Sequence, residues 1–426
     1  MAADLAILAL LIAGYALVAA RLDRWSIGPA LVFVTIGIVL SERVLGPISL
    51  QPESEPVQLL AEATLTLLLF ADASTLRPRS LEEDLGTMVR LLVVGLLLTI
   101  ALGTTTALLL FPGIPFGLAL LIGSALAPTD AALGQPVITN PSVPARIRRV
   151  LNVESGLNDG IATPFVLLAL SLATAEETGQ GPWLAQAALA LGIGVVVGLA
   201  VGGIGGRLLV AADRRQWTSP VSRRLLVLAL AVSCYLVALS TGGNGFIAAF
   251  VGGVAFAFAT RGEAVEAVHF TETQGSLLAI GVWAAFGLSL AGRLATDLWD
   301  PMAVLYAVLS LTILRMVPVA IALLGERYQG LTVLFVGWFG PRGLASVVFL
   351  YVGLAGLQEA GGDAGPFPAA VAWTVVLSVL LHGLTAGPLA ARYGRAMARL
   401  KPGARELEHS AEPGPSRTAW AGASRD

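Results

Sequence analysis

Long apolar runs recur along almost the whole of this 426-residue chain and are separated by short polar breaks. An α-helix needs about 20 apolar residues to cross roughly 30 Å of hydrocarbon. Because lipid offers the backbone no hydrogen-bond partners, such runs must form helices that satisfy their own peptide groups. The pattern therefore predicts an all-α integral membrane protein. Charged residues make up only 13% of the sequence, which leaves no room for a sizeable soluble domain.

The apolar runs predict about thirteen transmembrane spans. The first has no basic leader and no clear cleavage site behind it, so we interpret it as a retained helix and not as a signal peptide. We treat residues 1–400 as one transmembrane domain and expect the polar residues 401–426 to form a disordered cytoplasmic tail. The predicted spans are 3–20, 27–45, 57–76, 86–111, 116–141, 149–174, 183–211, 221–240, 242–260, 272–294, 301–324, 331–353 and 367–392.

The arginines fall on one side of this topology. With the N-terminus outside, the cytoplasmic segments hold RLDR, RPR, RIRR, DRRQ, SRR and the residues from Arg392, whereas the other side holds almost only Arg43 and Arg293. Basic loops stay in the cytoplasm, so we expect an outside N-terminus and a cytoplasmic C-terminus. The basic residues follow the topology and form no patch, so nucleic acid is not an expected partner.

Few residues could support metal, redox or catalytic chemistry. Cys234 is the only cysteine, which excludes an internal disulfide and a cysteine metal cage. None of the three histidines lies at ligand spacing, and we expect His269 and His382 to be satisfied, non-catalytic residues. We therefore predict neither an enzyme nor a resident cofactor.

Two predicted spans are interrupted by proline in mid-membrane. The fifth contains SALAPTDAAL, where Pro128 is followed by Thr129 and Asp130, and the twelfth contains GWFGPRGLAS, with Arg342 at its middle. Proline frees backbone groups that lipid cannot satisfy, so each break must lie against protein or a watery cavity. Asp130 can neutralise positive helix N-terminal ends and Arg342 negative C-terminal ends.

The two interrupted spans are seven spans apart, so they cross the membrane in opposite directions. This offset predicts two inverted six-helix repeats, spans 1 to 6 and 8 to 13, linked by span 7. Discontinuous helices at matching positions of inverted repeats typically surround an ion site at the bilayer midplane. The alternative is that both prolines are ordinary kinks, since proline and glycine are frequent in membrane helices.

The sixth span contains NVESGLNDG, residues 152–160. Asp159 lies about ten residues into the span, on the order of 15 Å deep. Glu154 and Asn158, and likewise Ser155 and Asp159, are four residues apart, so their oxygen-bearing side chains lie on adjoining faces of one helix. Hard oxygen ligands suit a hard cation such as sodium.

Two buried acids this close need separate roles. A buried ionised carboxylate is costly, so Asp159 should always hold either a proton or a cation. A buried arginine stays charged and must be paired, so we assign Glu154 to Arg315, with Arg342 as the second candidate. One exchanging carboxylate implies one cation per proton. The alternative is that these charges only hold the helices together.

These residues resemble the NhaP-type monovalent cation:proton antiporters, relatives of the eukaryotic sodium/proton exchangers. The resemblance covers residues 5–395, and it implies a thirteen-helix fold with a mobile core domain, including about 86–174 and 301–392, and a dimerisation domain that makes a homodimer. The stretches that carry it are LLLFADAS, GSALAPTDAA, RIRRVLNVESGLNDGIATP, GGNGFIAAFVGGVAFA and FGPRGLAS.

The resemblance also implies roles for single residues. Asp159 matches the exchanging acid and, with Ser155 and Thr129, would hold Na⁺, while Asp130 completes the broken-helix motif. Asn158 matches a residue that pairs with the acid at Glu154, and an asparagine before the exchanging acid is typical of the electroneutral branch. The family's core arginines correspond to Arg315 and Arg342.

The sequence thus predicts a secondary antiporter in the plasma membrane, the inner membrane of a bacterium, that exchanges Na⁺ for protons by alternating access. Cation and proton would compete at Asp159. Potassium or lithium are alternative cations. An ion channel, a non-transporting sensor on the same scaffold and a sodium-coupled organic-anion transporter are alternative functions.

Overall fold

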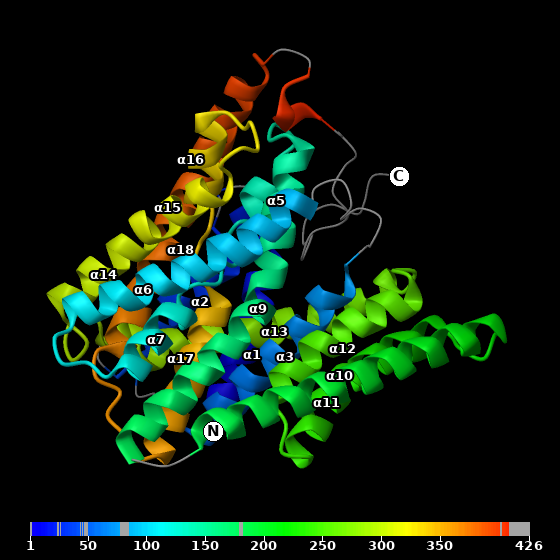
Figure 1. Cartoon of the computed structure of the whole chain (residues 1–426), viewed down its shortest axis with the longest axis horizontal. Coiled ribbons are helices and arrows are strands. Elements are labelled where there is room, and N and C mark those ends of the chain that lie inside the picture. Colours follow the sequence, from blue (N-terminus) through cyan, green and yellow to red (C-terminus); the bar gives the residue numbers. More distant parts are fainter. Residues whose placement is uncertain are drawn as a thin grey trace.

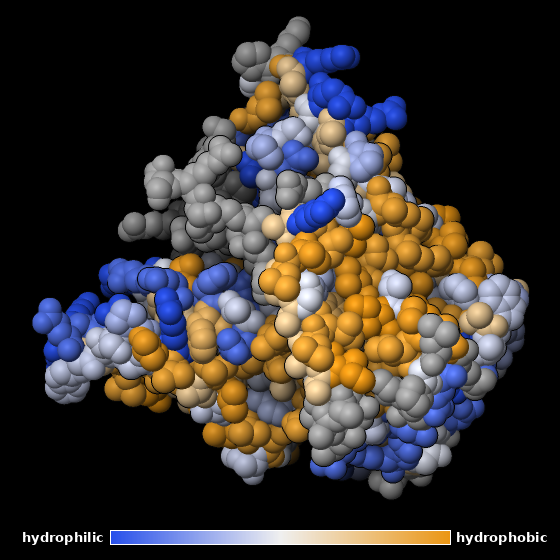
Figure 2. Space-filling view, turned by 180° about the vertical axis from the view of Figure 1, so that it is seen from behind, coloured by the Kyte–Doolittle hydropathy of each residue, from blue (hydrophilic) through white to orange (hydrophobic). Residues whose placement is uncertain are grey.

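The structure is a computed structural model that describes residues 2–23, 25, 27–42, 44, 46, 50–76, 85–178, 182–400 and 403–408. These residues form helices and no β-strand, which confirms the all-α prediction (Figure 1). Eight helices in the described part are long and apolar enough to cross a membrane. Figure 2 shows a broad apolar face between hydrophilic residues at either end, as expected where lipid surrounds a protein.

Every predicted span contains between one and three helical elements. The first half comprises α1 (Ala2–Asp23), α2 (Pro29–Leu40), α3 (Glu55–Ser74), α5 (Leu85–Val89), the π-helix η1 (Arg90–Gly95), α6 (Leu96–Leu110), α7 (Phe116–Ala125), α8 (Gln135–Ile138) and α9 (Ala145–Thr178). The rest comprises α10 (Trp183–Arg214), α11 (Pro220–Ser240), α12 (Gly245–Thr260), α13 (Val265–Ser289), the short η2 (Ala291–Arg293), α14 (Pro301–Leu311), α15 (Ile313–Ala322), α16 (Gly330–Trp338), α17 (Leu344–Glu359), α18 (Phe367–Met397) and η3 (Arg405–Leu407).

The helices pack in two groups. In Figure 1, α10, α11 and α12 lie side by side along one edge, and α12 and α13 pack on α3. The helices from α5 to α9 and from α14 to α18, which correspond to the predicted core domain, pack mainly on one another. That the second group moves against the first, and that the first group forms a dimer, stay predictions.

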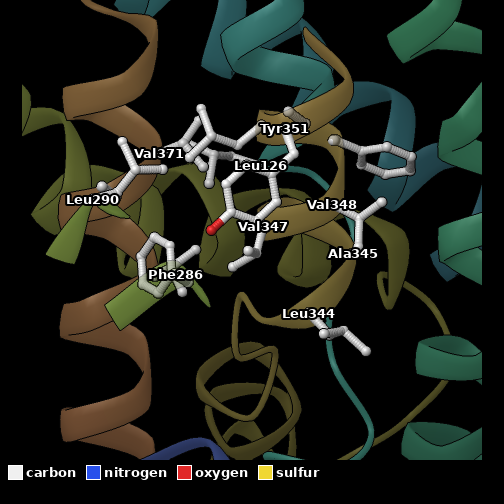
Figure 3. Packing of buried hydrophobic residues seen from close by; sticks show 14 of the residues in the cluster. Leu126, Phe286, Leu290, Leu344, Ala345, Val347, Val348, Tyr351 and Val371 are labelled. Carbon is white, nitrogen blue, oxygen red and sulfur yellow. The ribbon is translucent and has the colours of Figure 1, made fainter. Parts of the chain in front are cut away.

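Helix α17 lies at the centre of the molecule. Its residues Val347, Val348 and Tyr351 are fully buried, and they pack against Phe286 of α13 and Val371 of α18 (Figure 3). The Tyr351 hydroxyl lies 3.1 Å from the Ser289 hydroxyl, so its one polar atom is satisfied. A helix buried on all sides fixes the position of the break that precedes it.

The structure departs from the predicted spans in several places. The fourth span contains six residues of π-helix, Arg90–Gly95. The eleventh, predicted as one helix over 301–324, is interrupted at Thr312, whose hydroxyl donates to the Val308 carbonyl at 2.6 Å. The tenth starts earlier than predicted, at Val265, because its polar first turns continue the helix beyond the apolar run.

Residues 403–408 of the predicted tail pack against helix α16 in the structure. Glu406 is 1% exposed, and its Oε1 accepts hydrogen bonds from the Gln329 backbone amide at 2.7 Å and from the Thr332 hydroxyl at 2.8 Å. A carboxylate at the first turn of α16 satisfies free N–H groups, which explains why this polar stretch is ordered. Tail residues 401–402 and 409–426, and the RPR stretch at 77–79, lie outside the described residues.

Candidate ion-binding site

The two interrupted spans cross at their breaks. The chain leaves α7 at Ala125 and starts α8 at Gln135, and it leaves α16 at Trp338 and starts α17 at Leu344. The backbone N–H of Asp130 donates to the Pro341 carbonyl at 2.8 Å, so the two unwound segments touch directly. Residues 126–131 of the first break and 339–343 of the second are buried in protein, as a break at membrane depth requires.

Asp130 serves the start of helix α17. Its Oδ2 accepts a hydrogen bond from the Leu344 N–H at 2.8 Å, and its Oδ1 accepts from the N–H groups of Ala132 at 2.7 Å and Leu133 at 3.3 Å. Its side chain is buried and its carboxylate is tied to backbone donors of both broken spans. The carboxylate therefore neutralises a positive helix end.

Arg342 serves the end of helix α7. Its Nη1 donates to the carbonyls of Ala127 at 2.5 Å and Pro128 at 3.2 Å, which the break deprives of helical partners. Ser346, one turn into α17, donates to the Ala125 carbonyl at 2.7 Å. The two broken spans thus satisfy each other's free backbone groups with opposite charges.

Gly343 allows this contact, and we predict that Gly343→Ala destabilises the protein. A Cβ at this position would overlap the Asp130 carboxylate, so Asp130 must leave the Leu344 N–H. Overpacking of this kind costs about 1–3 kcal/mol. The measurement is the melting temperature in detergent. Gly330→Ala is the matched control, because no atom lies within 4 Å of that position, and an equal melting temperature for the two variants would contradict this contact.

A second polar cluster joins the first break to α9. The Thr129 and Ser155 hydroxyls are 3.0 Å apart, and the Asn158 amide donates to the Thr129 hydroxyl at 2.7 Å. Asp159 lies one turn along α9 from Ser155 and is 6% exposed. The structure thus brings two of the predicted cation ligands, Thr129 and Ser155, into contact, and it places the third, Asp159, one turn from Ser155 on α9.

Two oxygens of this cluster are buried without a donor. Asp159 Oδ1 and Asn158 Oδ1 accept no hydrogen bond from any residue that the structure describes. Buried oxygens are normally satisfied, and an orphaned one requires an explanation. Oxygens with free lone pairs beside two hydroxyls are suitable ligands for a hard cation or, at the carboxylate, for a proton. Groups of three or more His, Cys, Asp or Glu that could hold a metal ion are absent from the described part.

Glu154 is held away from this cluster by Arg315 of α15. The Arg315 Nη1 lies 2.7 Å from Oε1 and Nη2 lies 2.9 Å from Oε2, which makes a two-pronged ion pair. The two side chains are 2% and 3% exposed. Of the two arginines considered for Glu154, Arg315 is therefore the one that contacts it.

The implied pairing of Asn158 with Glu154 is not found in the described structure. Both Glu154 oxygens face Arg315, and the Asn158 amide instead turns to Thr129. Two further residues lie beside the second break and have no counterpart among the predicted site residues. Ser378 accepts the backbone N–H of Arg342, and His382 lies one turn further along α18. The sequence feature that could have indicated Ser378 and His382 is that they are two polar residues four positions apart in an otherwise apolar helix.

Comparison with known proteins places the chain among cation exchangers. Residues 7–392 match the family model described as sodium/hydrogen exchanger, transmembrane. The K(+)/H(+) antiporter NhaP of Alkalimonas amylolytica is 26% identical over 77% of this chain and 57% of that protein. The Na(+)/H(+) antiporter ApNhaP of Aphanothece halophytica is 28% identical over 51% of this chain and 40% of that protein. The chain thus spans about half the length of these relatives.

The fold is shared with a solved structure. The sodium proton antiporter MjNhaP1 from Methanocaldococcus jannaschii at pH 8 superposes with a TM-score of 0.72 and 19% sequence identity. The match covers 89% of this chain and 98% of that one. The overall helical fold of this chain therefore has a known precedent.

Proposed function

Because this chain belongs to the sodium/hydrogen exchanger family, we propose that it is a secondary antiporter that exchanges Na⁺ for protons by alternating access. It is a multi-pass membrane protein of a transporter family, and no enzymatic activity is proposed. The observation that carries the proposal is the buried Asp159 carboxylate, whose Oδ1 has no donor among the described residues and which lies one turn from the Ser155 hydroxyl.

Coupling follows from the cost of leaving Asp159 ionised and alone. A buried ionised carboxylate without a partner is strongly disfavoured, whereas a proton or a bound cation removes that penalty. The hydroxyls of Ser155 and Thr129, which lie 3.0 Å apart, would add oxygen ligands for the cation. The core helices would carry the ion site from one side of the membrane to the other only when a proton or a cation neutralises Asp159. Protons and cations therefore move in opposite directions.

The neighbouring acids support an exchange of one cation for one proton. Glu154 is bound by both prongs of Arg315, and Asp130 accepts three backbone hydrogen bonds. Both carboxylates are satisfied in their ionised form, so neither is free to trade a proton for a cation. Asp159 is then the single exchanging group, with Asn158 as a neutral neighbour that orients Thr129, and transport is electroneutral.

The proposal includes the membrane location, the orientation of the termini and a homodimer. The arginine bias supports a plasma membrane location, the bacterial inner membrane, with the N-terminus outside and the C-terminus in the cytoplasm. The group of α10, α11 and α12 supports a homodimer interface, since α10 and α11 expose large apolar residues on the outside of the molecule.

Purified protein in liposomes with an acidic interior tests the function. We expect external Na⁺ to alkalinise the lumen, followed with an internal pH dye, and we expect the rate to be unaffected by a clamp of the membrane potential. A response to K⁺ but not Na⁺ would keep the site and change the cation. A current at fixed pH would indicate a channel, and no proton movement with Na⁺, K⁺ or Li⁺ would overturn the proposal.

A further inference from the structure

The break between α16 and α17 is held from behind by two polar residues of α18. The backbone N–H of Arg342 donates to the Ser378 hydroxyl at 2.7 Å. On the other side of the break, His382 Nε2 lies 2.9 Å from the carbonyl of Trp338, the last residue of α16. Ser378 and His382 are 0% and 1% exposed, so both contacts are inside the protein.

The hydrogen-bond directions follow from these partners. Ser378 Oγ accepts from Arg342, and His382 Nδ1 lies 3.3 Å from this hydroxyl and 3.0 Å from the Ser378 carbonyl, which can only accept. Nε2 likewise faces an acceptor, the Trp338 carbonyl, so the ring is the donor in each bond that it makes with a carbonyl. The Ser378 hydroxyl and the His382 ring together link Arg342 through α18 to α16 by hydrogen bonds.

Further contacts fix the same helix end. The Trp338 indole N–H donates to the Thr385 hydroxyl of α18 at 3.1 Å, and the Trp338 and His382 ring centroids are 5.1 Å apart. Because Ser378, His382 and Thr385 lie on two successive turns of α18, they form one continuous polar strip against the break.

The segment that this strip holds is also the one that touches the ion site. The side chain of Arg342 binds the carbonyls of Ala127 and Pro128, and Pro341 accepts the Asp130 backbone N–H. Thr129 lies between these contacts and bonds with Asn158 and Ser155. If Arg342 moved away from α18, the carbonyls of Ala127 and Pro128 that it binds would move with it. Thr129, a proposed cation ligand, directly follows them and would also be displaced.

We propose that Ser378 and His382 are positioning residues for cation binding: they hold both ends of the second break and thereby hold Thr129 at the ion site. The inference rests on the proposed cation exchange for its transport readout, but its structural part can be tested without transport. Neither residue touches the cation, and the imidazole is not a proton carrier in this scheme.

Transport kinetics separate positioning from a general loss of folding. We expect Ser378→Ala and His382→Leu to raise the apparent KM for the cation on the order of tenfold, because small misplacements of ligands are costly. Ser378→Thr and His382→Gln keep a hydroxyl and an N–H donor and should restore the wild-type KM. Thr374→Val is the matched control, since Thr374 is equally buried on α18 but bonds only to the Ala370 carbonyl of its own helix.

Hydrogen exchange gives the readout that needs no transport. In Ser378→Ala and His382→Leu, the peptides that cover residues 339–344 and 126–133 should exchange hydrogen faster than in wild type. Peptides from α10 to α12 should exchange as in wild type in both variants. All peptides of the control variant Thr374→Val should also exchange as in wild type. If the two variants exchange hydrogen faster but the wild-type protein transports no cation, the proposed function is overturned and the positioning proposal stands. The positioning proposal would be overturned if residues 126–133 of the variants exchanged hydrogen at the wild-type rate or if the variants kept the wild-type KM. Loss of transport activity in His382→Gln would also overturn it.

Discussion

Asp159→Asn is expected to abolish cation/proton exchange and to leave the protein folded. Asparagine has nearly the same shape but can neither release a proton nor neutralise a cation. Asp159 Oδ1 has no donor among the described residues, so the substitution removes a buried charge and breaks no hydrogen bond at that oxygen. The measurement is proton flux in liposomes together with the melting temperature, which should equal or exceed that of wild type.

The control for this variant is another acid inside a predicted span. Glu62 of α3 accepts hydrogen bonds from the Tyr235 hydroxyl at 2.8 Å and the Gln58 amide at 3.1 Å, and Glu62→Gln should retain exchange. A cation that binds the folded protein raises its melting temperature, so saturating Na⁺ should stabilise wild type and Glu62→Gln but not Asp159→Asn. Full exchange by Asp159→Asn would remove the basis of the mechanism.

Most of the fold was predictable, because lipid allows few solutions. An apolar run long enough to span must be helical, and a proline followed by a charge in mid-membrane must end one helix and start another. The breaks at Pro128 and Pro341 lie where they were expected for this reason. The π-helix at Arg90–Gly95 and the interruption at Thr312 were not predictable, because hydropathy does not distinguish an α-helix from a local change in its winding.

The residues of the candidate site could be named from the sequence, but most of their contacts could not. A spacing of four residues shows that Glu154 and Asn158 share a helix face, but not toward which neighbour each turns. A buried carboxylate needs a positively charged partner, so the sequence predicted an arginine beside Glu154. Arg315 is that partner in the structure. The neutral Asn158 had no such constraint, and its amide faces Thr129. Ser378 was missed because a serine in an apolar helix usually bonds to its own backbone, even where a histidine lies four residues further along.

Glu154→Gln is expected to cause the largest loss of stability among these variants. The change removes one charge of a buried pair and leaves the Arg315 guanidinium buried without its counter-ion. Breaking a buried ion pair from one side typically costs about 3–5 kcal/mol. A marked fall of the melting temperature in detergent, with impaired exchange, is the expected result. Arg224→Gln is the control, because its pair with Glu266 is exposed and contributes little.

The double variant Glu154→Gln, Arg315→Met distinguishes a pair from two independent residues. If the glutamate matters mainly as counter-ion of Arg315, removal of both charges should recover much of the stability lost in Glu154→Gln, because no buried ion is then left unpaired. If each residue stabilises the protein by itself, the two losses should add. An unchanged melting temperature in Glu154→Gln would contradict the pairing at 2.7 Å, and with it the assignment of Asp159 as the only exchanging acid.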